Sequence, residues 1–282
     1  MLIKLIKYEF KATWRKLLPI YGILIAFSII NKLARGLESV TGSSDMISTI
    51  SVPVKGITVF LQAAAIIGVV AVTLYVILER FYKSFYGDEG YLTFTLPVSP
   101  WKHLTSKLTV SVFWALVSVI IGVVSLLISY YDDGILKVIT GNYVDIIGGS
   151  NSVYENIVIN FYVFYGINII SVSKLTLAAL FAGLIFEILM IYLSISIGHL
   201  FFKNKKLASF GAYLILSTAT RIISFVTTFL IGFINEEQWL TANSYNNGIK
   251  ILLVVALGTS VILAIICWTV LEEIINKKLN LE

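Results

Sequence analysis

Two ionisable residues lie in the middle of long apolar segments. Glu187 lies near the centre of 175–198, and Arg221 lies near the centre of 208–233. A charge at the centre of a bilayer costs roughly 2.5–3.5 kcal/mol on insertion scales, so opposite charges at equal depth are expected to meet. The sequence leaves two interpretations open: a gating or substrate-path pair, or a static ion pair that ties two helices together.

The other residues that could do chemistry do not form a catalytic pattern. His103 and His199 are far apart in the sequence and belong to no HExxH zinc motif. Cys267 is the one cysteine, which excludes a disulfide framework and argues against a Cys-based metal site. The chain also has no GxxxxGK[ST] phosphate loop and no GxSxG nucleophile elbow. We therefore expect a chain that is not an enzyme, has no cofactor of its own and does not hydrolyse ATP itself.

Residues 79–107 form an unusually long connection between two apolar segments. A turn between two membrane spans needs only a few residues, whereas this connection has 29. Loops of this length are usually functional or disordered. Its many aromatic residues could bury a large area, which argues against disorder. We interpret it as a folded cytoplasmic segment on which another protein docks; a solvated loop with lipid-facing aromatic residues is the alternative.

The order of residues in this connection is specific. Asp88-Glu89-Gly90 is followed by Leu96-Pro97-Val98-Ser99, and Lys107 then opens an apolar segment. This order resembles the loop of ABC-2-type ABC transporter permeases. The resemblance implies that the segment is a coupling helix in a groove of a separate ATPase subunit, which would bind ATP and Mg²⁺. The residues that it implicates in coupling are Gly87, Asp88, Glu89, Gly90, Tyr91, Leu96, Pro97 and Ser99.

The composition indicates an integral membrane protein. Hydrophobic residues make up 58% of the 282 residues and charged residues 13%, whereas soluble domains carry roughly 25% charged residues. A helix that crosses a bilayer needs roughly 20 apolar residues. We expect one membrane domain, 1–282, with no visible repeat. The predicted spans are 17–34, 57–78, 108–129, 175–198, 208–233 and 249–271.

Two of the segments admit more than one interpretation. Polar residues at 217–221 interrupt 208–233, so it is either a continuous span or a pair of short re-entrant helices. The charge-free stretch 156–173 is long enough to be considered as a seventh span. We instead expect an outer-face helix or re-entrant piece within the external segment 130–174, because a seventh crossing would place three lysines at 203–206 outside.

Residues 1–16 have a helical period with a basic face and an apolar face. We expect an interfacial helix that lies flat on the membrane before the first span. ABC-2-type permeases resemble the chain in this feature too. A signal peptide is the alternative, but no small-residue cleavage site follows. The residues that we assign to the interface are Lys4, Lys7, Lys11, Trp14 and Arg15.

The distribution of basic residues predicts the orientation. Most of the 21 lysines and arginines fall in the segments that lie inside if both termini are cytoplasmic, and the segments expected outside hold few of them. We therefore expect both termini in the cytoplasm and the protein in a bacterial plasma membrane. The segments expected inside are 1–16, 79–107, 199–207 and 272–282, and those expected outside are 31–56, 130–174 and 234–250.

Together these features predict an all-α polytopic membrane protein with six transmembrane helices, an amino-terminal interfacial helix and a cytoplasmic coupling helix, similar to ABC-2 or type V exporters. The resemblance implies a permease that exports an antibiotic, antimicrobial peptide or lipid-like molecule. Its expected partners are an ABC ATPase, a second permease (an identical or related chain) and the lipid bilayer, with no nucleic acid. The alternatives are an ATPase-independent secondary transporter or channel, and a non-transporting scaffold or sensor subunit.

The predicted orientation can be tested by cysteine labelling in a background from which Cys267 has been removed. Single cysteines at Ser43, Ser150 and Asn243 should react with a membrane-impermeant thiol reagent in intact cells. A cysteine at Asn204 should not react until the cells are opened. Labelling of Asn204 in intact cells would require an odd number of crossings before it, and would make 156–173 a span.

Overall fold

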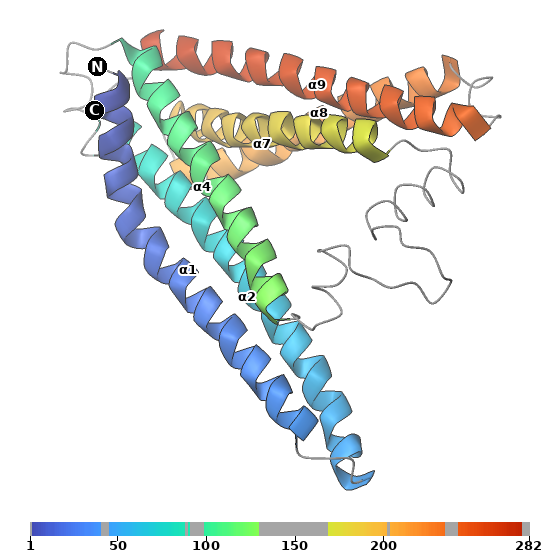
Figure 1. Ribbon diagram of the computed structural model, residues 1–282. Helices are drawn as coiled ribbons and strands as arrows, with labels where there is room; N and C mark the ends of the chain where they lie inside the picture. The colour runs from blue at the N-terminus through green and yellow to red at the C-terminus, as the bar shows by residue number, and fades with distance from the viewer. Residues whose placement is uncertain are drawn as a thin grey trace. The chain divides into compact units, whose positions relative to one another are not determined.

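The computed structural model describes residues 2–40, 45–87, 90, 99–129, 169–201, 204–234 and 242–277. Within these ranges the chain is helical and contains no strand (Figure 1). Six helices in the described ranges are long and apolar enough to cross a membrane, so the chain is a multi-pass membrane protein, as its composition predicts. The helices are α1 (Leu2–Val40), α2 (Asp45–Phe85), α4 (Pro100–Ser129), α7 (Ile169–His199), α8 (Lys205–Ile234) and α9 (Ala242–Lys277).

The helices extend well beyond the predicted spans. Residues 31–56 were expected as an outside loop, yet α1 continues to Val40 and α2 begins at Asp45. Hydropathy detects the part of a helix that crosses hydrocarbon, whereas the backbone hydrogen bonds continue until a cap or a glycine ends them. Of the two interpretations of 208–233, a continuous helix and a pair of short helices, the structure has the continuous one, α8. Residues 169–173 belong to α7, and 130–168 lie outside the described residues.

The amino-terminal region differs from the expectation of a short helix followed by a first span. One helix, α1, runs from Leu2 to Val40 through Pro19 without a boundary near residue 16. A proline removes one backbone hydrogen bond, and membrane helices tolerate this because neighbouring groups compensate. The first turns of α1 are also held by side-chain contacts with α2 and α4, described below. That these turns lie flat on the membrane stays a prediction.

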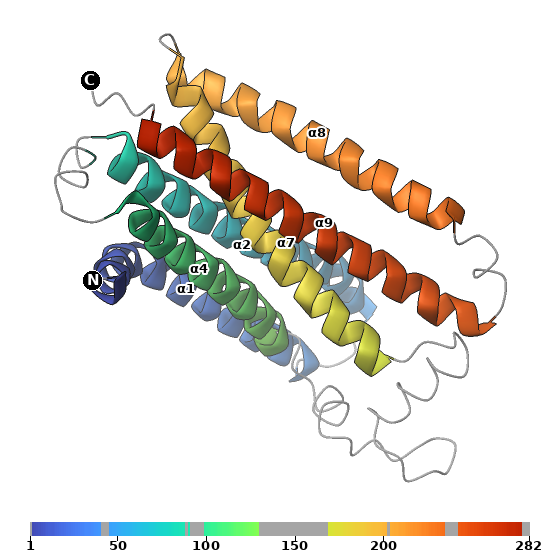
Figure 2. The same cartoon turned by 90° about the horizontal axis from the view of Figure 1, so that it is seen from above.

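The chain divides into two compact units. The first comprises Met1–Phe81 and Thr109–Lys137, and the second comprises Tyr82–Leu108 and Val138–Glu282. In the first unit α1, α2 and α4 run side by side (Figures 1 and 2). In the second unit α7 packs along both α8 and α9. The prediction of a single membrane domain stays a prediction.

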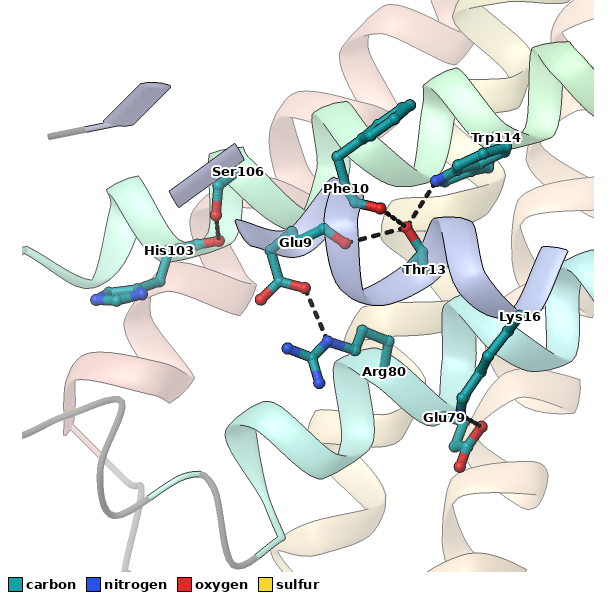
Figure 3. Close-up of polar contacts among 9 residues, drawn as sticks. All are labelled: Glu9, Phe10, Thr13, Lys16, Glu79, Arg80, His103, Ser106 and Trp114. Carbon is teal, nitrogen blue, oxygen red and sulfur yellow. Dashed lines mark hydrogen bonds and ion pairs between the residues drawn. The ribbon is translucent and has the colours of Figure 1, made fainter. Parts of the chain in front are cut away.

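Ion pairs join α1 to α2 near one end of the first unit (Figure 3). The Nε of Arg80 lies 2.9 Å from Oε2 of Glu9, and the Nζ of Lys16 lies 2.8 Å from Oε2 of Glu79. The Lys16–Glu79 pair is exposed and the Arg80–Glu9 pair is partly buried; ion pairs at the surface contribute about 0–1 kcal/mol each. Their main effect here is therefore to fix the register of the two helices. The ion pair of Glu9 with Arg80 also ties the first turns of α1 to α2.

Aromatic packing joins α1 to α4 one turn further along. The indole Nε1 of Trp114 donates a 2.7 Å hydrogen bond to Oγ1 of Thr13 (Figure 3). The rings of Phe10 and Trp114 stack with centroids 5.1 Å apart. Tyr21 of α1 links this interface to α2, because its hydroxyl shares a 3.1 Å hydrogen bond with Thr73 of that helix. The polar end of each aromatic side chain thus has a partner inside the helix bundle, as burial requires.

A buried polar network holds the same three helices together deeper in the unit. Asn31 Nδ2 donates to Gln62 Oε1 at 2.9 Å, and Gln62 Nε2 donates to Ser28 Oγ at 3.1 Å and to Ser125 Oγ. Gln62 is 1% exposed, and both serines are fully buried. Hydrogen bonds between membrane helices contribute about 0.6 kcal/mol on average. The network matters chiefly because no water is available inside the membrane to hydrogen-bond with its polar groups.

In the second unit, a close crossing joins α7 to α8 beside the turn between them. A Cβ on Gly198 would collide with the backbone nitrogen and Oγ of Ser209. The turn ends at Asn204, whose φ of 54° is left-handed, a conformation that asparagine tolerates better than most residues. The carbonyl of Asn204 accepts a 3.0 Å hydrogen bond from the Ala208 N–H and so begins α8. Glycine at 198 therefore sets how closely the two helices approach.

The crossing predicts different outcomes for two glycines in neighbouring helices. Gly198→Ala should lower the folded yield and the thermal midpoint of the purified protein, because the new methyl group meets Ser209 backbone. Gly211→Ala should be neutral or slightly stabilising, since nothing lies within 4 Å of a Cβ there and alanine favours helices over glycine by roughly 0.5–1 kcal/mol. Equal behaviour of the two variants would contradict the close crossing.

Candidate functional site

A pocket of about 450 Å³ lies between α7, α8 and α9 of the second unit. Its volume is within the range of about 300–1,000 Å³ that is common for small-molecule sites. Most of the pocket is lined by α7 and α8, with one residue from α9. The lining residues are Ala179, Leu180, Gly183, Leu184, Phe186, Glu187, Met190, Ser217, Thr220, Arg221, Ser224 and Ser260.

The two charged residues predicted near mid-membrane both line this pocket. Glu187 lies near the middle of the candidate span Val172–His199, and Arg221 near the middle of Lys205–Phe233. Both side chains are exposed, and Arg221 is close enough to act electrostatically on Glu187. However, among the described residues no salt bridge within 4 Å joins either of them to a partner. The two charges share one pocket without being paired to each other.

Hydroxyl groups complete the polar part of the lining. Ser217 and Thr220 each donate a 3.1 Å hydrogen bond to a carbonyl of their own helix, at Leu214 and Ser217 respectively. Ser260 of α9 does the same with Ala256 at 2.7 Å. Because the hydroxyl protons are used within the helices, the oxygen lone pairs remain as acceptors for a group in the pocket. These hydroxyls were not among the residues predicted from the sequence, although their helical spacing on α8 was a usable signal.

The side chains of α8 are arranged as a membrane requires, with the polar side inward. Ser217 is buried, whereas Ile215 and Ile222 on the opposite side are 70% and 63% exposed. Helices α8 and α9 bury few residues within the chain, and α7 buries many more. Apolar side chains that face lipid and polar ones that face a protein cavity satisfy both environments. The pocket thus gives the polar side of α8 a polar environment in mid-span.

A second feature joins the connecting segment to the end of α7. The rings of Tyr86 and His199 stack with centroids 4.2 Å apart, and the Tyr82 ring lies 5.1 Å from His199. Burial raises the pKa of Tyr86 to about 12, and the nearby Ser196 side chain opposes part of the shift. Tyr86 therefore stays neutral and protonated throughout the physiological pH range. We call Tyr82, Tyr86 and His199 the aromatic clamp.

The residues predicted to couple to an ATPase lie partly within the described chain. Gly87 and Gly90 close the carboxyl end of α2: the Gly90 N–H donates to the Gly87 carbonyl at 2.8 Å. A Cβ on Gly87 or Gly90 would lie 2.9 or 2.8 Å from a backbone carbonyl oxygen of α2, so this turn requires glycine. Ser99 precedes α4, and its carbonyl accepts from the Lys102 N–H at 3.0 Å. The remaining coupling residues, Asp88, Glu89, Tyr91, Leu96 and Pro97, lie outside the described residues.

The start of α4 follows from its sequence. Serine before Pro100 is a favoured arrangement, because proline at the first helical position has the right φ and lacks an N–H that would have no partner. Lys107, the lysine of the motif, is only 4% exposed. Its Nζ lies 5.6 Å from the centre of the Phe85 ring, so the two ends of the connection contact each other. Burial of a lysine at this point was not predicted.

The residues assigned to the membrane interface lie on the exposed side of α1. Lys4, Lys7, Lys11 and Arg15 are exposed, and Trp14 is 48% exposed. This side is free to contact headgroups, and the interfacial role stays a prediction. Within the part of the chain that the structure describes, no three His, Cys, Asp or Glu side chains gather as metal ligands.

Comparison of the chain with protein-family models, with curated proteins and with solved structures returns no match.

The aromatic clamp predicts a graded response to substitutions at Tyr86. Tyr86→Ala should lower the free energy of unfolding by roughly 2 kcal/mol, from lost ring area and stacking. Tyr86→Phe keeps the ring and should lose less. Tyr8→Ala serves as the control, because Tyr8 is 70% exposed and its loss should change little. Thermal unfolding of the detergent-solubilised variants measures this order, and equal losses for Ala and Phe would contradict the stacking.

Proposed function

We propose that the chain is the membrane-spanning permease subunit of an ATP-driven exporter of the ABC-2 type in a bacterial plasma membrane. In this proposal the substrate occupies the pocket between α7, α8 and α9. A separate ATPase subunit binds and hydrolyses ATP with Mg²⁺, and it docks on the segment between α2 and α4. Two permease chains, identical or related, form the working assembly with two ATPase subunits. Both termini are cytoplasmic.

The observation that supports this proposal best is the grouping of Tyr82–Leu108 with α7, α8 and α9 in one compact unit. The segment that resembles a coupling helix therefore belongs with the helices that line the pocket. The aromatic clamp is the contact between them, since Tyr82 and Tyr86 pack on His199 at the end of α7. A protein that binds the segment can act on the pocket through this contact.

Helix α7 is suited to transmit such a movement. His199 and Glu187 are on the same helix, about 18 Å apart along its axis at 1.5 Å per residue. The close crossing at Gly198 and Ser209 makes the adjoining end of α8 move with α7. A displacement of the clamp would therefore move α7 and carry Glu187 with it. The shape of the pocket would change as a result. ATP-driven closure of the ATPase subunits would supply that displacement.

An ATPase-independent transporter is the second candidate, and the intramembrane charges favour it to some degree. Ionisable residues that face a cavity within the membrane often mark ion or substrate paths. In that case the segment 79–107 would have no ATPase partner. The two candidates differ in one measurable property, namely whether an ATP-hydrolysing subunit stays bound to the chain.

The test is co-purification of the tagged chain from its native cells in a mild detergent, with ATP hydrolysis measured in the eluate. The wild-type chain should retain an ATPase subunit. The double variant Asp88→Lys and Glu89→Lys should insert normally but lose it, because charge reversal at an interface costs several kcal/mol and prevents correct orientation.

The matched control is the double variant Glu236→Lys and Glu237→Lys, which reverses a similar glutamate-containing pair in a segment expected outside. It should keep the ATPase bound. Retention of the ATPase in the Asp88 and Glu89 variant, at normal expression, would contradict the coupling assignment. Absence of any ATPase from the wild-type eluate would favour the second candidate.

A further inference from the structure

We propose that the pocket binds an amphipathic molecule whose head carries both a positive and a negative group, with the positive group at Glu187 and the negative group at Arg221. This inference rests on the proposed transport function, for which it names the class of substrate. The head would lie between the two charged side chains, and the apolar part would lie along α7.

The argument begins with the two charges. Both line the pocket, both are exposed, and among the described residues neither is held in a salt bridge. In a low-dielectric medium an uncompensated charge is costly. Two opposite charges that do not contact each other leave room for a group between them. A zwitterionic head neutralises both charges, whereas a singly charged head neutralises one and leaves the other.

The surrounding hydroxyls support the same choice. Ser217 and Thr220 lie on α8 beside Arg221 and present acceptor oxygens to the pocket, since their protons are bonded within the helix. Acceptor oxygens favour a head that also carries N–H or N⁺–C–H groups. The polar part of the lining is therefore mixed in charge and suits a head that is mixed in charge.

The position of the apolar part follows from the spacing on α7. Leu180 and Leu184 lie on the same side of the helix as Glu187, two turns and one turn before it respectively. Gly183 lies between them in the lining, and nothing lies within 4 Å of a Cβ built on it. This open space next to two leucines can hold an alkyl chain. The pocket thus has a charged end and an apolar end, as an amphipathic ligand requires.

The test uses the purified full-length chain in dodecyl maltoside and three ligands with the same alkyl chain. These are dodecylphosphocholine, which is zwitterionic, dodecyl phosphate, which is anionic, and dodecyltrimethylammonium, which is cationic. Isothermal titration calorimetry should show that the zwitterion binds about tenfold more tightly than either ion, the difference expected for one lost charge-assisted contact. Equal binding of the zwitterion and the phosphate would overturn the proposal.

Substitutions then test the two charges by selectivity, which does not depend on how much protein folds. Glu187→Gln should move the preference toward dodecyl phosphate, and Arg221→Gln should move it toward dodecyltrimethylammonium. Glu272→Gln and Lys206→Gln remove charges from α9 and α8 outside the lining, and should leave the preference unchanged. Unchanged selectivity in both pocket variants would overturn the proposal.

The position of the apolar part has its own variant. Gly183→Leu fills the open space and should weaken binding of all three ligands at least tenfold without changing their order. Gly211→Leu is the matched control, because nothing lies within 4 Å of a Cβ there either and Gly211 is not in the lining. Equal effects of the two substitutions would contradict the proposed place of the alkyl chain.

Mass spectrometry of lipids that co-purify with the chain identifies the source of the ligand. A zwitterionic phospholipid that is retained by wild type and lost from Gly183→Leu would indicate a membrane lipid. Its absence, together with dodecylphosphocholine binding, would indicate a free amphiphile. No ATPase takes part in these measurements. A failure of the zwitterion preference is thus distinct from a failure of the transporter proposal, which shows as absence of a co-purifying ATPase.

Discussion

The constraint on which this structure depends is that polar groups within a membrane must find partners inside the protein. The two units meet it in different ways. In the first unit Asn31, Gln62 and two serines form a network whose members satisfy one another away from any surface. In the second unit the polar side of α8 and Glu187 of α7 line a pocket, and among the described residues no salt bridge holds Glu187 or Arg221. A closed network stabilises helix packing, whereas an open one provides a place for a ligand.

The two units also differ in the contacts that hold their helices together. Around the closed network α1, α2 and α4 carry ion pairs and an aromatic stack that fix their register. In the second unit the fixed point is the close crossing at Gly198, near one end of α7 and α8. The aromatic clamp contacts α7 at this same end. The end of α7 that is fixed to α8 is therefore also the end that the connecting segment contacts, and the pocket lies further along both helices.

The sequence predicted the parts of the fold that depend on composition and depth. Six apolar helices, and the position of Glu187 and Arg221 in one pocket, follow from hydropathy and from antiparallel packing of consecutive helices. The limits of the helices did not follow, because α1 and α2 continue into polar sequence where hydropathy has no signal. The clamp could not be predicted either, since Tyr86 and His199 are distant in sequence and meet only through the tertiary structure. Whether the two mid-membrane charges touch also depends on side-chain geometry that depth alone does not determine.

A ligand that contacts both Glu187 and Arg221, as proposed above, would link binding to movement. A ligand shifts a conformational equilibrium only by the difference between its affinities for the two conformations. Because Glu187 is on α7 and Arg221 on α8, a head group that contacts both depends on the separation of these helices. If α7 moves relative to α8 at a point distant from the Gly198 crossing, that separation changes. The affinity for a zwitterionic head would then change more than the affinity for a head with a single charge. A pocket with one charge on each of two helices therefore suits a protein that must bind its substrate in one conformation and release it in another.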